Sequence, residues 1–431
     1  MTSHRDFLEG LFRTAINAAH PSGCLPPMLP EVPKAGRLIL LAAGKAAGSM
    51  AEVAEAHYLD GGFSPERLSG IAVARHGYGR PLRKVEMVEA GHPVPDQAGL
   101  DAAARTLALA DSATRDDLVL VLMSGGASAN WIAPADGISL ETKQAVTRAL
   151  LRSGAAIGEI NTVRKHISRI KGGRLARHAF PATLVTIGIS DVPGDDPAVI
   201  GSGPTVPDPT TLADARAIVS RYRLTLPDAV AAALDDPANE SPKPDDPAFR
   251  AARYHLAARP LDAFISAEAV VRAAGYECIF LGDRVEGEAR DVAAEQARLA
   301  RDLKAQGRRA VILSGGELTV TIRGDGRGGP NQEFALALAA ELDGVAGIAA
   351  LAGDTDGTDG GGGEADDPAG AYVDGLSAER ARARGVDPHR CLADNNSTAF
   401  FAVLKDLISP GPTFTNVNDF RAIMVNDVDT P

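Results

Sequence analysis

Residues 189–208 read Ile-Ser-Asp-Val-Pro-Gly-Asp-Asp-Pro-Ala-Val-Ile-Gly-Ser-Gly-Pro-Thr-Val-Pro-Asp, and this stretch is the most informative in the chain. It follows an apolar, β-branched run over 182–189, which predicts a buried parallel strand. After the strand come three acids, Asp191, Asp195 and Asp196, and then a Gly-Ser-Gly-Pro loop whose backbone can approach an anion closely. Carboxylates beside such a loop indicate phosphate and metal chemistry at a strand end.

Similar turns follow other predicted strands. Strand 117–123 runs into Ser-Gly-Gly-Ala-Ser at 124–128, and strand 309–313 runs into Ser-Gly-Gly-Glu at 314–317. Turns of this kind expose backbone N–H groups where ligands of open α/β sheets bind. A further strand, 37–42, leads into Gly44-Lys45-Ala46-Ala47-Gly48 and a predicted helix, 49–59. Lys45 would therefore stand near a helix N-terminus, a natural place for a phosphate.

Strands and helices alternate along the chain, which predicts an α/β protein whose N-terminal sheet is mostly parallel and Rossmann-like, with helices on both faces. At 431 residues, two domains are expected. A proline-rich stretch at 235–247 separates an N-terminal domain, 1–240, from a smaller C-terminal α/β domain with a mixed sheet, 248–431. The other expectations that matter below are an amphipathic helix over the first ~20 residues, a helix over 160–178, a strand over 261–265, a helix over 267–275 and a final polar loop over 413–419.

Composition excludes several classes of protein. The net charge of −12 argues against nonspecific binding to nucleic acid, and no apolar stretch approaches the ~20 residues that span a bilayer. The N-terminus lacks the apolar segment of a secretory signal, so we expect a cytoplasmic protein with no membrane partner. Three widely separated cysteines fit neither a disulfide framework nor a zinc site.

Four segments could carry chemistry, and each has a plainer interpretation. Lys45 does not lie in a P-loop, because Ile39 and Ala46 stand where that motif needs Gly and Ser or Thr. The loop 353–360 spaces three acids through glycines, which indicates a site for Mg²⁺ or substrate hydroxyls, or else a surface turn. The segment 163–174 gathers five Lys or Arg residues, and either binds a small anion or forms a solvated helix face. His92 follows a strand and either orients a substrate or has a structural role.

The loop 324–329 matches Gly-x-Gly-x-x-Gly, the fingerprint of dinucleotide-binding proteins. Taken literally, it supports an NAD(P)H-dependent reductase. The preceding strand, 318–322, alternates polar and apolar residues, which is typical of a hairpin arm rather than of the buried first strand of a dinucleotide-binding unit.

Ten ordered blocks give the chain a resemblance, over nearly its full length, to the MOFRL-type glycerate kinases, the glycerate 2-kinase family. The blocks lie at 44–51, 91–96, 124–128, 159–166, 171–174, 190–208, 315–317, 329–333, 355–360 and 415–419. Proteins of this family transfer phosphate from ATP, with Mg²⁺, to the 2-hydroxyl of D-glycerate, and some carry a hydroxypyruvate reductase label. The resemblance implies a two-domain α/β enzyme with its site in the interdomain cleft and D-glycerate as its small-molecule partner.

The resemblance also implies roles for particular residues. The catalytic residues would be Lys45, Asp191 and Arg327. Nucleotide and phosphate would be bound by Gly44, Ser124, Gly125, Gly126, Ser128, Gly201, Ser202, Gly203, Gly315, Gly316 and Glu317. The substrate would be bound by His92, Arg164, Lys165, Asn331 and Glu333, with His166 behind Arg164 and Lys165. The metal would be held by Asp195, Asp196, Asp356 and Asp359.

Two positions depart from the family pattern. Pro330 stands where the family often has Arg, and Asn396 replaces an expected Asp. If that Arg contacts phosphate, Arg327 would have to replace it. A third class of function is thus a sugar-acid-binding protein without turnover. The oligomeric state stays open, with a homodimer as one candidate.

Overall fold

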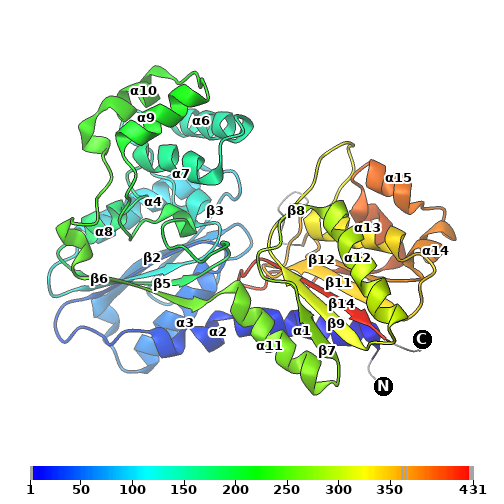
Figure 1. The fold of residues 1–431 in the computed structure, drawn as a ribbon. Helices are drawn as coiled ribbons and strands as arrows, with labels where there is room; N and C mark the ends of the chain where they lie inside the picture. The colour runs from blue at the N-terminus through cyan, green and yellow to red at the C-terminus, as the bar shows by residue number, and fades with distance from the viewer. Residues whose placement is uncertain (1–2, 361–363, 365, 427–431) are drawn as a thin grey trace. The chain divides into compact units, whose positions relative to one another are not determined.

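The computed structural model describes residues 3–360, 364 and 366–426, and the chain divides into two compact units (Figure 1). One is continuous, Pro21–Ala257, and is called the inserted unit here. The other, called the split unit, combines Met1–His20 with Ala258–Pro431. This division differs from the expected boundaries of 1–240 and 248–431, since residues 1–20 pack with the C-terminal part and residues 241–257 with the inserted unit.

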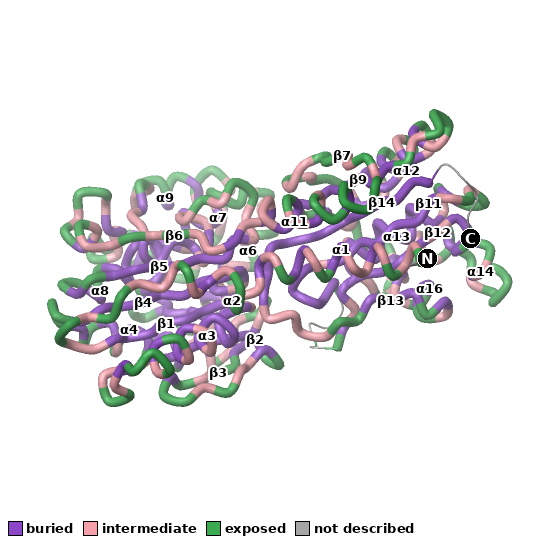
Figure 2. Tube along the Cα trace, turned by 90° about the horizontal axis from the view of Figure 1, so that it is seen from below, coloured by how far each residue is buried: buried purple, intermediate pink, exposed green. Residues whose placement is uncertain are grey.

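The inserted unit is built on a sheet with strand order β3-β2-β1-β4-β5-β6 in the described residues. The strands are β3 (Glu86–Ala90), β2 (Leu68–Arg75), β1 (Leu38–Ala43), β4 (Leu118–Met123), β5 (Thr183–Ile189) and β6 (Ala252–Ala258). The first five run parallel to one another, as the alternation of strands and helices predicted. Every residue of β1 and β4 is buried, as expected for central strands covered on both faces (Figure 2).

Helices cover this sheet. The side chains of α4 (Gln97–Asp111) and α8 (Arg174–Ala179) share a core with β1, β2 and β4, while α3 (Ala47–Asp60) packs against β1 and β2 without joining that core. A separate apolar cluster joins α6 (Leu140–Arg152), α7 (Ile157–His166), α9 (Leu212–Arg221) and α10 (Asp228–Asp235). Two short helices, α2 (Pro21–Cys24) and α5 (Ala127–Asn130), complete the unit.

The helix expected over 160–178 is two helices. It stops at His166, because Ile167 leaves the helical path and its carbonyl accepts from the N–H of Ala135 at 3.1 Å. The helical path resumes at Arg174, after Gly172 and Gly173, which adopt φ values of 59° and 82°. The backbone N–H groups of these glycines donate instead to the carbonyls of Ser202 and Gly203, at 3.0 and 2.7 Å. The break therefore places the basic segment against the Gly-Ser-Gly loop.

The split unit holds a mixed sheet, as predicted, with strand order β13-β12-β11-β14-β9-β7 in the described residues. The strands are β13 (Leu407–Ile408), β12 (Gly370–Asp374), β11 (Ile348–Asp354), β14 (Asp419–Val425), β9 (Ala310–Gly315) and β7 (Glu277–Phe280). Neighbours run antiparallel except β7 and β9. A short pair, β8 (Gly287–Glu288) and β10 (Leu318–Thr319), lies outside this sheet.

Both faces of the mixed sheet are covered. The helices α12 (Ala289–Ala305), α13 (Pro330–Glu341) and α16 (Ser397–Leu404) form a common core with it, to which α14 (Ser377–Arg382) adds Ala381. The short helix α15 (Pro388–Ala393) packs against α13 and α16 (Figure 1). The helices α1 (His4–Ala18) and α11 (Pro260–Ala273) pack against each other and against sheet strands. The N-terminal helix was predicted correctly, and it leaves the expected N-terminal domain because its apolar face meets α11, β11 and β14.

Two other expectations for this unit are wrong. Residues 261–265 form part of α11 rather than a strand, because Pro260 occupies the first helical turn and Ala263, Phe264, Ala267 and Val271 are buried at helical spacing. The polar loop at 413–419 does not end the fold, since the apolar run after it pairs as β14 between β11 and β9. No helix in the described residues is long and apolar enough to cross a bilayer.

Candidate functional site

Two of the predicted strand-end turns interlock in the inserted unit. The backbone N–H of Lys45 donates to the carbonyl of Gly125 at 2.8 Å, and the N–H of Ala46 donates to Ser124 Oγ at 2.9 Å. A side chain on Gly44, whose φ is 117°, would overlap Ser124, so only glycine allows the turns to approach this closely. Lys45 stands just before α3, as predicted.

His92 joins these turns. Gly126 adopts a φ of 85°, and a Cβ there would lie 3.0 Å from His92 Cδ2 and 3.3 Å from Lys45 Cγ. The structure therefore brings together three predicted residues that are more than 30 positions apart. We name the set Gly44, Lys45, His92 and Ser124–Gly126 the Lys45 site.

The Gly-Ser-Gly loop adjoins the second of these turns. Ser202 lies in a short 3₁₀ turn, Ile200–Ser202, and its Oγ is 2.6 Å from Ser128 Oγ. A Cβ on Gly201 would collide with Met123 and lie 3.2 Å from Ala127 Cβ. The predicted phosphate-binding residues Ser128, Gly201, Ser202 and Gly203 thus lie together.

In the basic segment, 163–174, some side chains are paired within the protein, whereas others have polar atoms without a hydrogen-bond partner. Lys165 Nζ lies 3.5 Å from Asp208 Oδ1 in a buried pair, and His166 Nδ1 lies 2.8 Å from the carbonyl of Thr162. His166 Nε2 contacts Glu240, so this ring is held within the protein. Arg164 donates through Nη1 to Asn161, but its buried Nε has no hydrogen-bond partner. Burial lowers the pKa of Arg164.

The three acids after β5 differ in their surroundings. Asp191 is half-buried, and Tyr254, whose pKa is raised by burial and then by the charges of Asp191 and Asp196, lies near it. Asp196 is exposed and accepts from the N–H of Ala198 at 2.8 Å, which closes a tight turn. Asp195 Oδ1 is buried without a hydrogen-bond partner. Across residues 3–360, 364 and 366–426, no three His, Cys, Asp or Glu side chains converge as a ready metal site.

In the split unit, Asp359 caps α13. Its Oδ1 accepts from the N–H of Asn331 at 3.0 Å, and its Oδ2 accepts from the N–H of Gln332 at 2.8 Å. These bonds satisfy two of the N–H groups that every helix leaves free at its start. Burial raises the pKa of Asp359 to about 7, against the opposing effect of these N–H donors. Asp359 therefore has a structural role that the sequence analysis did not anticipate.

Other predicted residues of this unit are also engaged within the protein. Glu333 accepts from Arg290 Nε at 2.7 Å, and burial raises its pKa. Asn331 Nδ2 donates to Asp419 Oδ1 at 2.7 Å, and Asp356 Oδ1 accepts from the N–H of Thr358 at 2.8 Å. Gly315 and Gly316 bond to neighbouring backbone and to Arg421, whereas Glu317 and Arg327 are exposed.

Several buried charged side chains were not among the individually predicted site residues. Arg421 is fully buried, 3.0 Å from Asp419 Oδ2, and it donates to the carbonyl of Gly316. In the inserted unit, Lys143 and Lys171 are only 2% and 1% exposed. Lys171 belongs to a block that supported the family resemblance, whereas nothing in the local sequence marks Lys143 or Arg421.

Comparison with known proteins decides the family. A MOFRL family model matches residues 310–419, and a model described as a domain of unknown function, DUF4147, matches residues 7–235. The chain is 36% identical over 414 residues to a D-glycerate 2-kinase of Thermotoga maritima, covering 95% of each protein. The chain belongs to the MOFRL-type glycerate kinase family.

A solved structure agrees with this assignment. The crystal structure of a glycerate kinase from Thermotoga maritima matches with a TM-score of 0.85 and 35% identity, over 98% of this chain and 99% of that one. A family relative from Agrobacterium vitis, named "Putative hydroxypyruvate reductase", is 46% identical over 98% of this chain and 95% of its own length.

The glycine loop of this MOFRL-type chain is packed with its own side chains. Cβ atoms on Gly324 and Gly326 would collide with Asp394 and Asn396, and one on Gly328 would collide with Ser397. Dinucleotide-binding loops use glycines so that the backbone can approach a pyrophosphate. Here the glycines make room for residues 394–397, which is a structural reason for the motif.

The same packing accounts for the two departures from the MOFRL-type pattern. Pro330 occupies the first turn of α13, a position that suits proline because its N–H would have no helical partner. Asn396 Oδ1 lies 3.3 Å from the N–H of Arg327, and an Asp oxygen could accept the same bond. Both residues are thus compatible with the local backbone.

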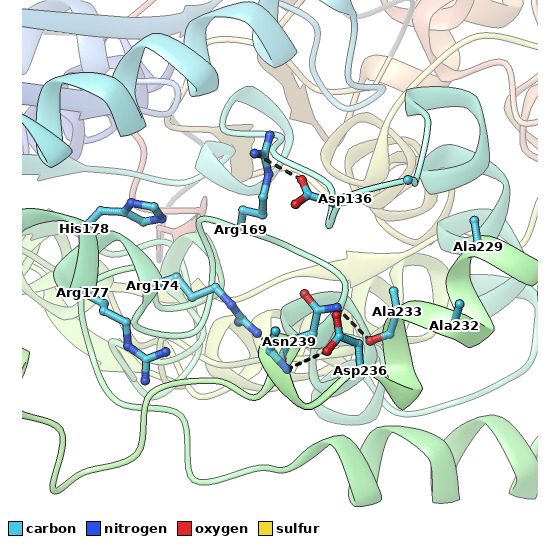
Figure 3. Close-up of a pocket in the computed structure, with 12 residues that line it drawn as sticks. Asp136, Arg169, Arg174, Arg177, His178, Ala229, Ala232, Ala233, Asp236 and Asn239 are labelled. Carbon is cyan, nitrogen blue, oxygen red and sulfur yellow. Dashed lines mark hydrogen bonds and ion pairs between the residues drawn. The ribbon is translucent and has the colours of Figure 1, made fainter.

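A cavity of about 470 Å³ in the inserted unit is lined by none of the predicted site residues of this MOFRL-type chain (Figure 3). Its wall is basic, but Arg169 lies 3.4 Å from Asp136 and Arg177 lies 2.7 Å from Asp246. Arg174 Nη1 donates to the carbonyls of Lys165 and Lys171 at 2.9 and 3.2 Å, so one wall of the cavity supports the basic segment from behind.

Proposed function

We propose that the protein is a D-glycerate 2-kinase that transfers the γ-phosphoryl group of ATP to the 2-hydroxyl of D-glycerate, giving 2-phosphoglycerate and ADP. The observation that best supports this proposal is the Lys45 site, in which two strand-end turns and His92 meet at the start of a helix. Phosphoryl transfer depends mainly on positioning and charge neutralisation, and this arrangement offers a cation, backbone N–H groups and a helix N-terminus.

In this proposal Lys45 neutralises charge on the transferring phosphoryl group. Ser124, Gly125, Gly126 and Ser128, with Gly201, Ser202 and Gly203, hold the phosphates. Asp191 accepts the proton of the 2-hydroxyl as the new O–P bond forms and the bond to ADP breaks. His92, Arg164 and Lys165 orient the hydroxy acid, although the pairing of Lys165 with Asp208 favours Arg164 as the direct contact.

Mg²⁺ fits some of the predicted metal-binding acids better than others. Asp195 has a buried oxygen without a hydrogen-bond partner, whereas both oxygens of Asp359 accept N–H bonds. Mg²⁺ in kinases is commonly held by one or two carboxylates together with phosphates and water, so three converging acids are not required. We assign Asp195 to the metal, which would screen the phosphate charges.

The test is a coupled assay of the purified protein with D-glycerate, ATP and Mg²⁺, in which the product is identified as 2- or 3-phosphoglycerate. We expect 2-phosphoglycerate. A parallel assay with hydroxypyruvate and NADH should be silent, since the loop 324–329 is filled by the chain itself. NADH oxidation without an ATP-dependent product would overturn the proposal.

A further inference from the structure

Three cationic side chains of the inserted unit, two of them buried and one half-buried, have no counter-charge among the described residues. Lys143 lies on α6, Arg164 lies on α7, and Lys171 lies in the loop that follows α7. Both lysines are almost fully buried. Within the part of the chain that the structure describes, none of the three forms an ion pair. The adjacent Lys165, in contrast, is paired with Asp208.

Their hydrogen-bonding capacity is also largely unused. Lys143 Nζ donates to the carbonyl of Arg164 at 3.3 Å, and Lys171 Nζ donates to the carbonyl of Ser128 at 3.0 Å. An ammonium group has three donors, so most of this capacity has no acceptor among the described residues. The buried Nε of Arg164 has none either.

Lys171 places this cluster beside the turn that begins in the Lys45 site. The carbonyl that Lys171 contacts belongs to Ser128, whose hydroxyl lies 2.6 Å from that of Ser202. Arg174 fixes the backbone carbonyl of Lys171 from the other side. The cations therefore adjoin the turns to which the phosphate-binding role is assigned.

Burying a cation without a partner is costly, and clustered cations raise the cost. Burial lowers the pKa of Lys143 and Lys171 well below the ordinary value, and neighbouring cations lower it further. These neighbours are Arg164 and Arg174 for Lys143, and Arg164 and Lys143 for Lys171. An anion bound among them would remove this cost and favour the charged lysines.

We propose that Lys143, Arg164 and Lys171 together bind an oxyanion of the substrates, either the carboxylate of the hydroxy acid or a phosphate of the nucleotide. The identity of the anion rests on the proposed function. The existence of an anion site does not, because it follows from the contacts and burial of the three side chains.

The first experiment compares the wild type with Lys143→Met and Lys171→Met, and with Lys84→Met, which changes an exposed lysine of the same unit. Calorimetric titrations with D-glycerate, ATP and inorganic phosphate are paired with melting curves. We expect each buried variant to lose affinity for at least one anion by on the order of 10²-fold, while Tm is unchanged or higher. Lys84→Met should alter neither quantity.

The pattern of loss identifies the anion. Weaker binding of D-glycerate alone assigns the site to the carboxylate, and weaker binding of ATP alone assigns it to the nucleotide. If wild type binds inorganic phosphate through these lysines but lacks kinase activity, the anion site stands and the proposed function falls. Unchanged affinity for all three probes together with a lower Tm would show that the lysines are structural and would overturn the inference.

A second measurement needs no variant. Titrations of the wild type with D-glycerate and with inorganic phosphate, repeated at one pH in buffers of different ionisation enthalpy, report proton exchange on binding. Because the free protein disfavours charged Lys143 and Lys171, we expect net proton uptake as the anion binds. The comparison is made at several pH values between 7 and 10, and an absence of uptake throughout that range with both anions would count against the site.

Discussion

Lys45 is the residue on which the proposed chemistry depends most directly. Its backbone is fixed by Gly125, and its side chain passes the Gly126 turn beside His92. We expect Lys45→Ala to lower kcat for D-glycerate phosphorylation by ~10²-fold or more, by analogy with other groups that stabilise developing charge. Tm should change little because the side chain is only half-buried.

Steady-state kinetics beside melting curves check this expectation. Lys34→Ala is the matched control, since Lys34 is exposed and belongs to the same unit. A fall in kcat of less than threefold for Lys45→Ala would remove the residue from the chemistry.

Arg421, unlike Lys45, is fully buried and forms an ion pair with Asp419 of the same unit. Removing it would leave Asp419 buried beside Asp359 with its charge uncompensated. We expect Arg421→Met to cost about 3–5 kcal/mol of unfolding free energy, with part of the loss restored in the double variant Asp419→Asn/Arg421→Met. Urea titrations measure both quantities.

The exposed pair formed by Arg382 and Asp343 at 2.8 Å provides a comparison in the same unit. Arg382→Met should cost less than about 1 kcal/mol, because water screens a surface pair. If Arg421→Met lowers the unfolding free energy by no more than Arg382→Met does, the buried pair stabilises the protein no more than the surface pair.

At the residue scale, the sequence was informative where function depends on local backbone. Lys45, Ser124 and Ser202 were selected as candidates because strand-end glycine turns are visible as short motifs, and the structure brings these turns together. Lys143 and Arg421 were missed because their significance comes from burial against distant segments. Asp359 was placed in a metal site on the basis of loop composition, and only the position of α13 reveals that it caps a helix.

At the scale of elements, Asp117 anchors the starts of two neighbouring strands. Its carboxylate accepts from the backbone N–H of Arg37, before β1, and from the N–H of Thr114 at 2.9 Å, before β4. Burial alone would raise the pKa of Asp117, but bonds from Arg37 and Thr114 outweigh it and hold this pKa at about 2, against 3.8 ordinarily.

A lowered folded-state pKa stabilises the protein above the unfolded value and ceases to do so as pH falls through the folded value. We therefore expect Asp117→Asn to cost about 2 kcal/mol at pH 7, with the difference from wild type shrinking between pH 4 and pH 2. Urea titrations of both proteins between pH 2 and pH 7 measure this difference in unfolding free energy. Asp116→Asn is the control, because Asp116 is the exposed neighbour of Asp117. A difference that is independent of pH would rule out the charge of Asp117 as the cause.

Elements were predicted well where periodicity was strong and poorly where a capping residue decided the outcome. The buried strands β1, β4 and β5 follow directly from continuous apolar runs. The strand proposed over 261–265 failed because Pro260 and the bonds between Arg259 and Asp262 start a helix there. The segment between α7 and α8 is held by backbone bonds to residues 133–135 and to Ser202 and Gly203. These partners are about 30 residues away along the chain, so they leave no local signal.

In the molecule as a whole, the inserted unit interrupts the sequence of the split unit after His20, and the split unit resumes at Ala258. The inserted unit is continuous in sequence and contains its own sheet and cores. We expect the fragment 21–257 to unfold cooperatively by itself, and the fragment 258–431 to fail to fold because it lacks α1, which packs on α11, β11 and β14. Circular dichroism melts of both fragments test this. A cooperative melt of 258–431 alone would show that α1 is dispensable.

The sequence indicated two domains because a proline-rich stretch separates two α/β patterns. It could not reveal that residues 1–20 belong with the second pattern, since an amphipathic helix fits any apolar surface of suitable shape. The assignment of α1 depends on contacts with strands more than 300 residues later.

The position of α1 also sets an order of events during synthesis. The ribosome makes Leu8, Leu11 and Phe12 before the inserted unit, yet the strands β11 and β14, against which α1 packs, are made after it. Throughout translation of the inserted unit, the apolar face of this helix lacks the strands that it packs against in the folded protein. The nascent chain therefore exposes an apolar helix face until β11 and β14 have been made. A chaperone that binds exposed apolar segments would be needed most before β14 is complete.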